Sequence, residues 1–113
     1  MAGAQSLIGG GELPGLQLVA WVLWDSNAGA IKRQFGVSAM TKQAAGKYTI
    51  TLSAPMADSN PMVLLRGTWK ASQTSQAFTH DSWGANSTTQ VMLSTYANGT
   101  AADIHLIWVG IYQ

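Results

Sequence analysis

The sequence predicts an all-β protein: an antiparallel β-sandwich or jelly-roll-like fold of about six to eight short strands, with no substantial helix. Three observations predict this class. Short apolar runs recur along the 113 residues, several of them alternate with the period of two that is typical of a strand, and turn-forming residues separate them. The length is enough for one domain with its own core.

Composition narrows the classes of function. Hydrophobic residues make up 47% of the chain and charged residues only 10%, against about a quarter in a typical soluble domain. We therefore expect part of the apolar surface to be buried against other copies or another protein. The net charge is +1 and the basic residues are scattered, which disfavours nucleic-acid binding. No apolar run approaches the roughly 20 residues that insert across a membrane.

Residues 1–15 are rich in glycine and contain one apolar pair, Leu7-Ile8. Glycine loses much conformational entropy when it is ordered, which predicts a flexible N-terminal arm unless something binds it. The arm is either a frayed terminus or an anchor peptide, with Leu7 and Ile8 as the anchor candidates. The β-sandwich domain is then expected over residues 16–113.

Residues 16–24 form the strongest predicted strand, and both of its faces are apolar. Such a strand is covered on both sides, and the second cover could be an adjacent subunit. Residues 25–29 have the composition of a turn, and residues 30–37 return as the partner strand of a hairpin.

Residues 38–46 are small and predict a connection, with room for one short helical turn at most. Residues 47–53 alternate cleanly and predict a half-buried strand. Pro55 and Pro61 bracket a corner, because each lacks a backbone donor.

Three further strands are expected over residues 62–69, 89–96 and 102–112. Gly67 is a candidate for a β-bulge in the first of them. The last strand is apolar on both faces after its first residues, and we place it centrally in its sheet.

A polar stretch, residues 70–88, separates two of these strands and is long enough to be a functional loop. It contains Phe78, His80, Asp81 and Trp83, which are the candidates for contact with a ligand or receptor. An exposed Trp83 could stack on a sugar ring, or it could fold back to cover a sheet edge. A loop offers no preorganised base for a His80-Asp81 catalytic site.

Asp103 and His105 would share a face at the i, i+2 spacing of a strand. That spacing could begin a metal site or an acid–base pair, but more ligands would be needed, and the only other histidine is His80. A strand-end salt link or a core histidine is the alternative. The chain has no cysteine, which removes disulfides, thiolate metal sites and cysteine nucleophiles. Since neither the His80-Asp81 pair nor the Asp103 and His105 pair is a complete site, we expect no catalytic residues, no metal and no cofactor.

Tryptophans in the predicted strands are expected to lie in the core or at an interface between subunits. The interface candidates are Trp21, Trp24, Trp108 and Tyr112.

Four segments carry a resemblance to a known family. They are Ala20-Trp21-Val22, then Ile31 with Phe35-Gly36-Val37-Ser38, then Gly46-Lys47-Tyr48-Thr49-Ile50-Thr51-Leu52, then Pro55-Met56-Ala57-Asp58-Ser59-Asn60. Their order resembles a module of the tail fibres and related virion proteins of tailed bacteriophages. The closing Ile107-Trp108-Val109-Gly110-Ile111 resembles the apolar last strand of such modules.

The resemblance implies a β-sandwich in a homotrimer at the distal end of a fibre, which recognises the host surface. It predicts a non-enzymatic structural protein of the virion, made in the host bacterial cytoplasm, because residues 1–6 lack the features of a signal peptide. Its partners would be other copies of the chain and other virion proteins, with a glycan of the host surface as a further candidate. Two alternatives stay open: a capsid decoration or head-fibre protein attached through residues 1–15, and a carbohydrate-binding module that uses Trp83.

Overall fold

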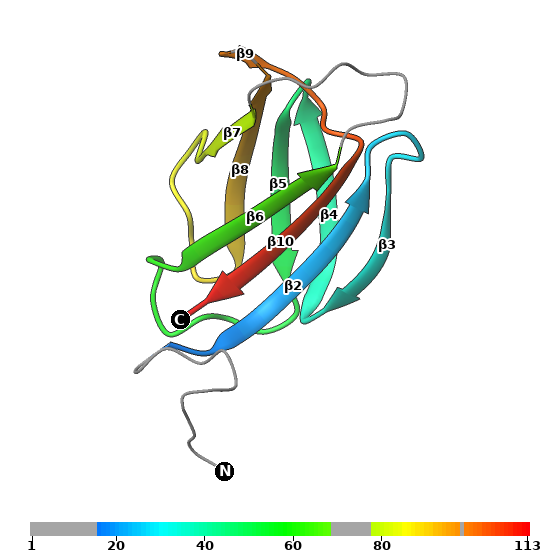
Figure 1. Ribbon diagram of the computed structural model, residues 1–113. Helices are drawn as coiled ribbons and strands as arrows, with labels where there is room; N and C mark the ends of the chain where they lie inside the picture. The colour runs from blue at the N-terminus through cyan, green and yellow to red at the C-terminus, as the bar shows by residue number, and fades with distance from the viewer. Residues whose placement is uncertain (1–15, 69–77, 98) are drawn as a thin grey trace.

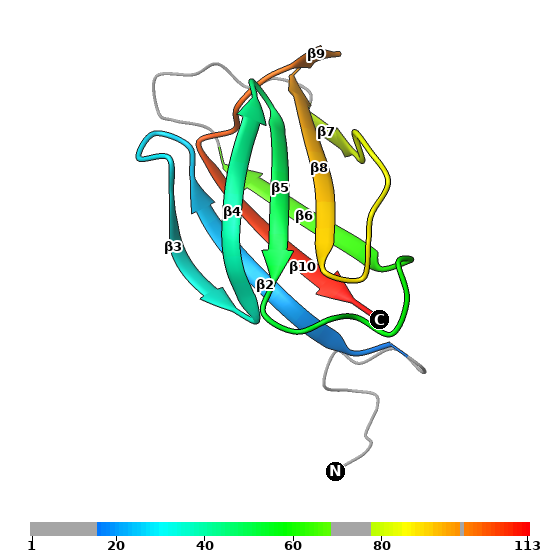
Figure 2. The same cartoon turned by 180° about the vertical axis from the view of Figure 1, so that it is seen from behind.

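The computed structural model describes residues 16–68, 78–97 and 99–113, and this part of the chain folds as an antiparallel β-sandwich without a helix. One sheet has four strands in the order β3-β2-β10-β6, and the other has the order β4-β5-β8-β7 with β9 paired to β8. We call them the β2–β10 sheet and the β5–β8 sheet. Figures 1 and 2 show the two layers from opposite sides. The predicted fold class is therefore confirmed.

The strands are short, and every pair is antiparallel. The bounds in the first sheet are β2 Leu18–Asp25, β3 Ala30–Phe35, β6 Met62–Thr68 and β10 Leu106–Tyr112. In the second sheet they are β4 Val37–Ala44, β5 Lys47–Leu52, β7 Phe78–Asp81, β8 Gln90–Ala97 and β9 Thr100–Ala101.

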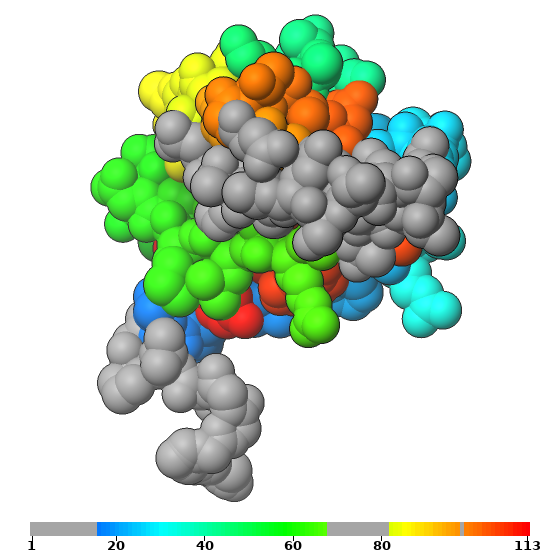
Figure 3. All heavy atoms as spheres, turned by 45° about the horizontal axis from the view of Figure 1, so that its top comes forward, coloured from blue at the N-terminus to red at the C-terminus, as the bar shows by residue number. Residues whose placement is uncertain are grey.

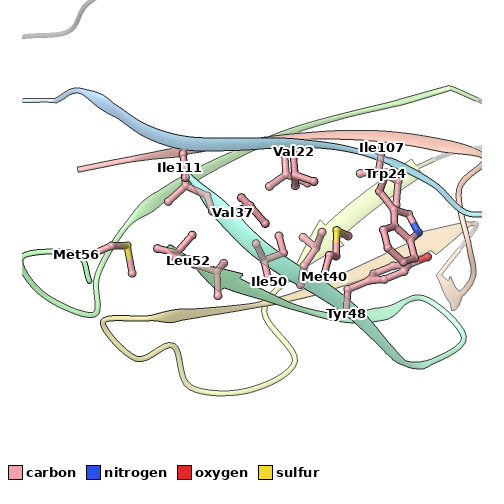
Figure 4. Packing of buried hydrophobic residues seen from close by; sticks show 14 of the residues in the cluster. Val22, Trp24, Val37, Met40, Tyr48, Ile50, Leu52, Met56, Ile107 and Ile111 are labelled. Carbon is pink, nitrogen blue, oxygen red and sulfur yellow. The ribbon is translucent and has the colours of Figure 1, made fainter. Parts of the chain in front are cut away.

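The core lies between the two sheets and is built from every second residue of the central strands (Figure 4). Strand β2 contributes Val22, β5 contributes Ile50, and β10 contributes Ile107, each with no exposed surface. Fully burying such a side chain stabilises the fold by about 1.5–3 kcal/mol. Trp24 and Tyr48 join the sheets through an edge-to-face contact, with ring centroids 5.8 Å apart.

The chain crosses from one sheet to the other at Gly36, between β3 and β4. Gly36 has a φ of 71°, and a Cβ there would lie 2.9 Å from the carbonyl oxygen of Val19. A residue with a side chain would meet both the left-handed backbone and this close approach. Glycine at this position therefore lets one continuous segment form edge strands in both sheets.

Several expectations for individual elements are confirmed. The turn at residues 25–29 joins β2 to β3, and the Asp25 carboxylate accepts the backbone N–H of Asn27 at 2.9 Å. Strand β8 lies where residues 89–96 predicted a strand. Strand β10 is central in its sheet, paired with β2 on one side and β6 on the other.

The expected connection at residues 38–46 is wrong, because most of it forms the edge strand β4. The pairing of β4 with β5 shifts register twice, between Val37 and Ala39 and between Lys42 and Ala44. These irregularities break the period of two, and only Val37 and Met40 of β4 are buried. An edge strand with so few buried positions has no clean alternation in the sequence.

Three smaller expectations are also corrected. Strand β6 pairs with β10 without a register shift at Gly67, so there is no bulge there. Residues 102–105 precede β10 and are not in a strand, although Ile104 is fully buried. The polar stretch 70–88 contains strand β7, which pairs with β8 as an edge strand.

Candidate functional site

The outer surface of the β2–β10 sheet is apolar and rich in aromatic side chains. Alternate residues of β2 and β10 point away from the core, because their neighbours Val22 and Val109 are completely buried. We call this surface the outer aromatic face, and it comprises Trp21 and Leu23 of β2, Phe35 of β3, Leu64 of β6, and Trp108 and Tyr112 of β10.

The strand register brings these residues side by side. Gly110 pairs with Trp21 on one side and with Leu64 on the other, and Trp21 pairs with Phe35, so one row crosses all four strands. Phe35 is 56% exposed and Leu64 is 45% exposed. An outer sheet face that meets water is normally polar, whereas contiguous exposed apolar surface marks an interaction site.

Trp108 lies along its own strand and fills the space above Gly110. A Cβ on Gly110 would lie 3.0 Å from Cζ3 and 3.1 Å from Cζ2 of the Trp108 ring, and closer still to Cη2, well inside van der Waals contact. The absence of a side chain at Gly110 therefore lets the ring lie low over the sheet. This packing makes the middle of the outer aromatic face a continuous hydrocarbon surface.

Two arginines flank this face in the next row. Leu23 pairs with Arg33 of β3, and Trp108 pairs with both Leu23 and Arg66 of β6, so the row reads Arg33, Leu23, Trp108, Arg66. Aromatic residues and arginine are the types enriched in protein–protein interfaces. The composition and the arrangement of this face fit protein contact.

The structure brings together three of the four interface candidates and separates the fourth. Trp21, Trp108 and Tyr112 all belong to the outer aromatic face. Trp24 is only 4% exposed and is part of the core, so the expectation that its side chain meets another subunit is wrong. Both faces of β2 are apolar in the sequence, so nothing local distinguishes the buried face from the outer one. The anchor candidates Leu7 and Ile8 lie outside the described residues.

The ligand-contact candidates lie on and beside β7, at the far edge of the β5–β8 sheet. Phe78, His80 and Asp81 are residues of β7, whose backbone pairs with Thr95 and its neighbours in β8. The side chains of these three residues lie outside the described part of the chain, so their contact with a ligand stays a prediction.

Trp83 follows β7 and folds back onto the β5–β8 sheet. Its indole N–H donates a hydrogen bond to the backbone carbonyl of Tyr48 in β5, at 2.8 Å. Next to it, a Cβ on Gly84 would be 3.6 Å from the Met92 side chain of β8. Thr49, which points outward from β5, is only 7% exposed. Of the two alternatives for Trp83, these contacts fit folding back, although onto the interior strand β5 and not over a sheet edge. Its 38% exposed surface is what remains for a ligand.

Asp103 forms a polar cluster at the end of the sandwich. Its carboxylate accepts hydrogen bonds from Lys42 Nζ at 2.5 Å, from the Gly46 backbone N–H at 2.8 Å and from the Tyr48 hydroxyl at 2.7 Å. Figure 3 looks onto this end, where the turn between β4 and β5 lies beside the segment around residue 100. The cluster fastens the approach to β10 onto the β5–β8 sheet.

Two opposing effects act on the carboxyl of Asp103. Burial raises its pKa, but the hydrogen bonds from Lys42, Gly46 and Tyr48 outweigh burial and hold the pKa below its usual value. Burial also raises the pKa of the Tyr48 hydroxyl, which stays protonated and donates to Asp103. A carboxylate held ionised by three donors is suited to a structural link.

His105 takes part in a different contact. Its Nδ1 lies 2.8 Å from the side-chain amide nitrogen of Asn27 and 4.0 Å from the Asp25 carboxylate. Asp103 and His105 therefore do not share a site, and the salt-link alternative describes Asp103. Within the described ranges, no group of three histidine, aspartate or glutamate side chains could hold a metal ion. The described part of the chain contains no helix that is long and apolar enough to cross a bilayer.

Sequence reasoning missed Phe35, Leu64, Arg33 and Arg66 as members of the site. Alternation within each strand shows which residues share a face, but only the register shows that four separate strands bring these residues beside Trp21 and Trp108. Comparison of the chain with protein-family models, with curated proteins and with solved structures found no significant match.

Proposed function

We propose that this protein is a non-enzymatic structural component of a tailed-phage virion, which assembles with copies of itself as a homotrimer associated with the tail or a fibre. The observation that carries self-assembly is the outer aromatic face, a continuous apolar row across four strands with arginines beside it. The assignment to a virion rests on the sequence resemblance.

Self-association explains the unusual composition of the chain. With 10% charged residues, a monomer would leave the outer aromatic face in water, where contiguous apolar surface is unfavourable. Three copies that turn this face toward a common axis remove it from solvent, because a closed ring leaves no copy of the patch exposed. Arg33 and Arg66 extend long side chains that can keep their charged ends hydrated at the rim.

The oligomeric state tests the proposal. We expect the full-length chain to sediment as a trimer, and we expect Phe35→Arg and Leu64→Arg to give folded monomers, since both side chains are already largely exposed. The matched control is Thr41→Arg, an exposed position in β4 of the other sheet, which should stay trimeric. A wild-type chain that is monomeric at high micromolar concentration would refute self-assembly.

Antibody labelling of intact virions in the electron microscope tests the location. Label at the tail end supports an adsorption component that contacts the host surface. Label over the head overturns the tail assignment in favour of a capsid decoration or head-fibre protein, and the absence of label from virions refutes both.

A carbohydrate-binding module remains the third possibility. It predicts saturable glycan binding that is lost on Trp83→Ala. Because the indole N–H of Trp83 already bonds to β5, that experiment needs Trp83→Phe as a second variant, which keeps an aromatic surface but removes the donor.

A further inference from the structure

A cleft of about 510 Å³ opens at the end of the sandwich where the chain enters β2. Its walls are mainly apolar, formed by Val19, Phe35, Leu52, Pro55 and Met56. The volume lies within the range of about 300–1,000 Å³ of ligand-sized pockets. Figure 4 shows Met56 and Leu52 at this end of the core.

Several polar groups beside the cleft are already hydrogen-bonded within the protein. The Gln113 side chain donates to the Asp58 carboxylate at 2.7 Å and to the Asp58 carbonyl at 2.9 Å, and it accepts the Ala57 backbone N–H at 2.8 Å. The Met56 backbone N–H donates to the Thr88 carbonyl at 2.7 Å. These polar groups are therefore already hydrogen-bonded within the protein, and most of what the cleft offers to an occupant is apolar surface.

The N-terminal arm is attached at this cleft. Gln17 and Gln113, the latter a lining residue, exchange two backbone hydrogen bonds of 2.9 Å, and Val19 also lines the cleft. Residues 1–15 therefore join the sandwich within a few residues of the cleft walls. Leu7-Ile8 is the only adjacent pair of large aliphatic residues in that segment.

The length and composition of the connection allow Leu7 and Ile8 to return. Residues 9–16 include four glycines, and eight residues of a glycine-rich chain span roughly 16 Å on average and up to about 27 Å when extended. A tether of this length gives an effective concentration in the millimolar range. The chain's own arm therefore has an advantage over any arm supplied from solution.

We propose that Leu7 and Ile8 of the same chain occupy the cleft lined by Val19, Phe35 and Met56. This inference does not rest on the proposed function, since it concerns the isolated chain. Docking removes two aliphatic side chains and the apolar walls from water, which favours it by the hydrophobic effect. It also extends the apolar surface next to Phe35, which belongs to the outer aromatic face.

A disulfide-trapping experiment tests the proposal, because the chain has no cysteine of its own. Full-length protein carries Ile8→Cys with Ala54→Cys, an exposed residue that lines the cleft, and is oxidised under mild conditions. We expect an intramolecular disulfide, seen on a non-reducing gel as a fast-migrating monomer. The control pair Ile8→Cys with Ala28→Cys, in the turn between β2 and β3, should react at least tenfold more slowly.

One further substitution distinguishes docking of Leu7 and Ile8 in the cleft from a reaction that is fast only because residue 8 is tethered near it. Adding Leu7→Ser to the reactive pair should slow the disulfide at least tenfold, whereas adding Leu13→Ser should not change its rate. Equal rates with and without Leu7→Ser overturn the proposal, because tethering alone would then explain the reaction. A covalent dimer as the main product also overturns it and assigns the cleft to the arm of a second copy.

Discussion

Gly110→Ala tests the packing that makes the outer aromatic face continuous. The new Cβ would lie 3.0 Å from Cζ3 and 3.1 Å from Cζ2 of the Trp108 ring, and closer still to Cη2, whereas carbon atoms in contact are about 3.5–4.0 Å apart. The ring must therefore rise by about 1 Å to restore that separation. Trp108 is on the outer surface and only half-buried, so it can move without disturbing the core.

In the proposed trimer the raised ring would meet the neighbouring copy, and the expected cost there is about 1 kcal/mol per chain, the lower end of the range for overpacking. If each subunit of a trimer loses that amount, the trimer loses about 3 kcal/mol, which is roughly a hundredfold in its dissociation constant. Because the midpoint concentration of a monomer–trimer equilibrium varies as the square root of that constant, the midpoint should rise about tenfold.

Sedimentation velocity over a concentration series measures the weakening of the trimer, and tryptophan emission reports the movement of the Trp108 ring. Gly84→Ala is the matched control, since the nearest atom to its new Cβ would be 3.6 Å away and the residue lies beside the other sheet. We expect Gly84→Ala to sediment as the wild type. If Gly110→Ala assembles and emits like the wild type, then the Trp108 ring does not lie over Gly110 and the outer aromatic face is not continuous there.

Four further substitutions test stability, and the free energy of unfolding of each variant is measured with urea. The Ser94 hydroxyl is fully buried and has no hydrogen-bond partner in the described part of the chain, so Ser94→Ala should stabilise the fold by about 1 kcal/mol. Its neighbour Thr95 donates to the Ala102 carbonyl at 2.6 Å, so Thr95→Val should destabilise the fold by about 1–3 kcal/mol. Stabilisation by Thr95→Val, or destabilisation by Ser94→Ala, would contradict the assignment of that residue. The pKa of Asp103 is lower in the folded protein than its usual value of 3.8. Its ionised carboxylate therefore contributes fully to the free energy of unfolding above pH 3.8, and this contribution is lost as the pH falls through the lower folded pKa. Asp103→Asn should flatten the loss of stability in acid, and an unchanged pH profile would show that other groups cause that loss. Trp83→Phe should cost about 0.5–1.5 kcal/mol through loss of the bond to Tyr48, and no loss would mean that the loop is held by other contacts.

Much of the architecture could be predicted from local patterns. The period of two in β5 and the turn residues between β2 and β3 are properties of neighbouring residues, and both are found where the sequence places them. The edge strand β4 was missed because its two register shifts interrupt the alternation. Strand β7 was missed because it is four residues long within a polar stretch.

The candidate site could be predicted only in part, because it depends on pairing between distant segments. Trp21 and Trp108 are recognisable as strand tryptophans, but their place beside Phe35 and Leu64 follows from the register of β2, β3, β6 and β10. The Asp103 cluster joins residues 55 to 61 positions apart in the chain. Such distant partners leave no local periodicity.

The sequence by itself determined the all-β class, the turn between β2 and β3 and the central position of the last strand, because each depends on side chains a few residues apart. Only the tertiary structure decided which apolar face of β2 is buried, and so assigned Trp24 to the core and Trp21 to the surface. The physical reason is that a strand with two apolar faces carries no local preference between them. The choice is made when two sheets pack, and the face that is not covered becomes the surface available to a partner.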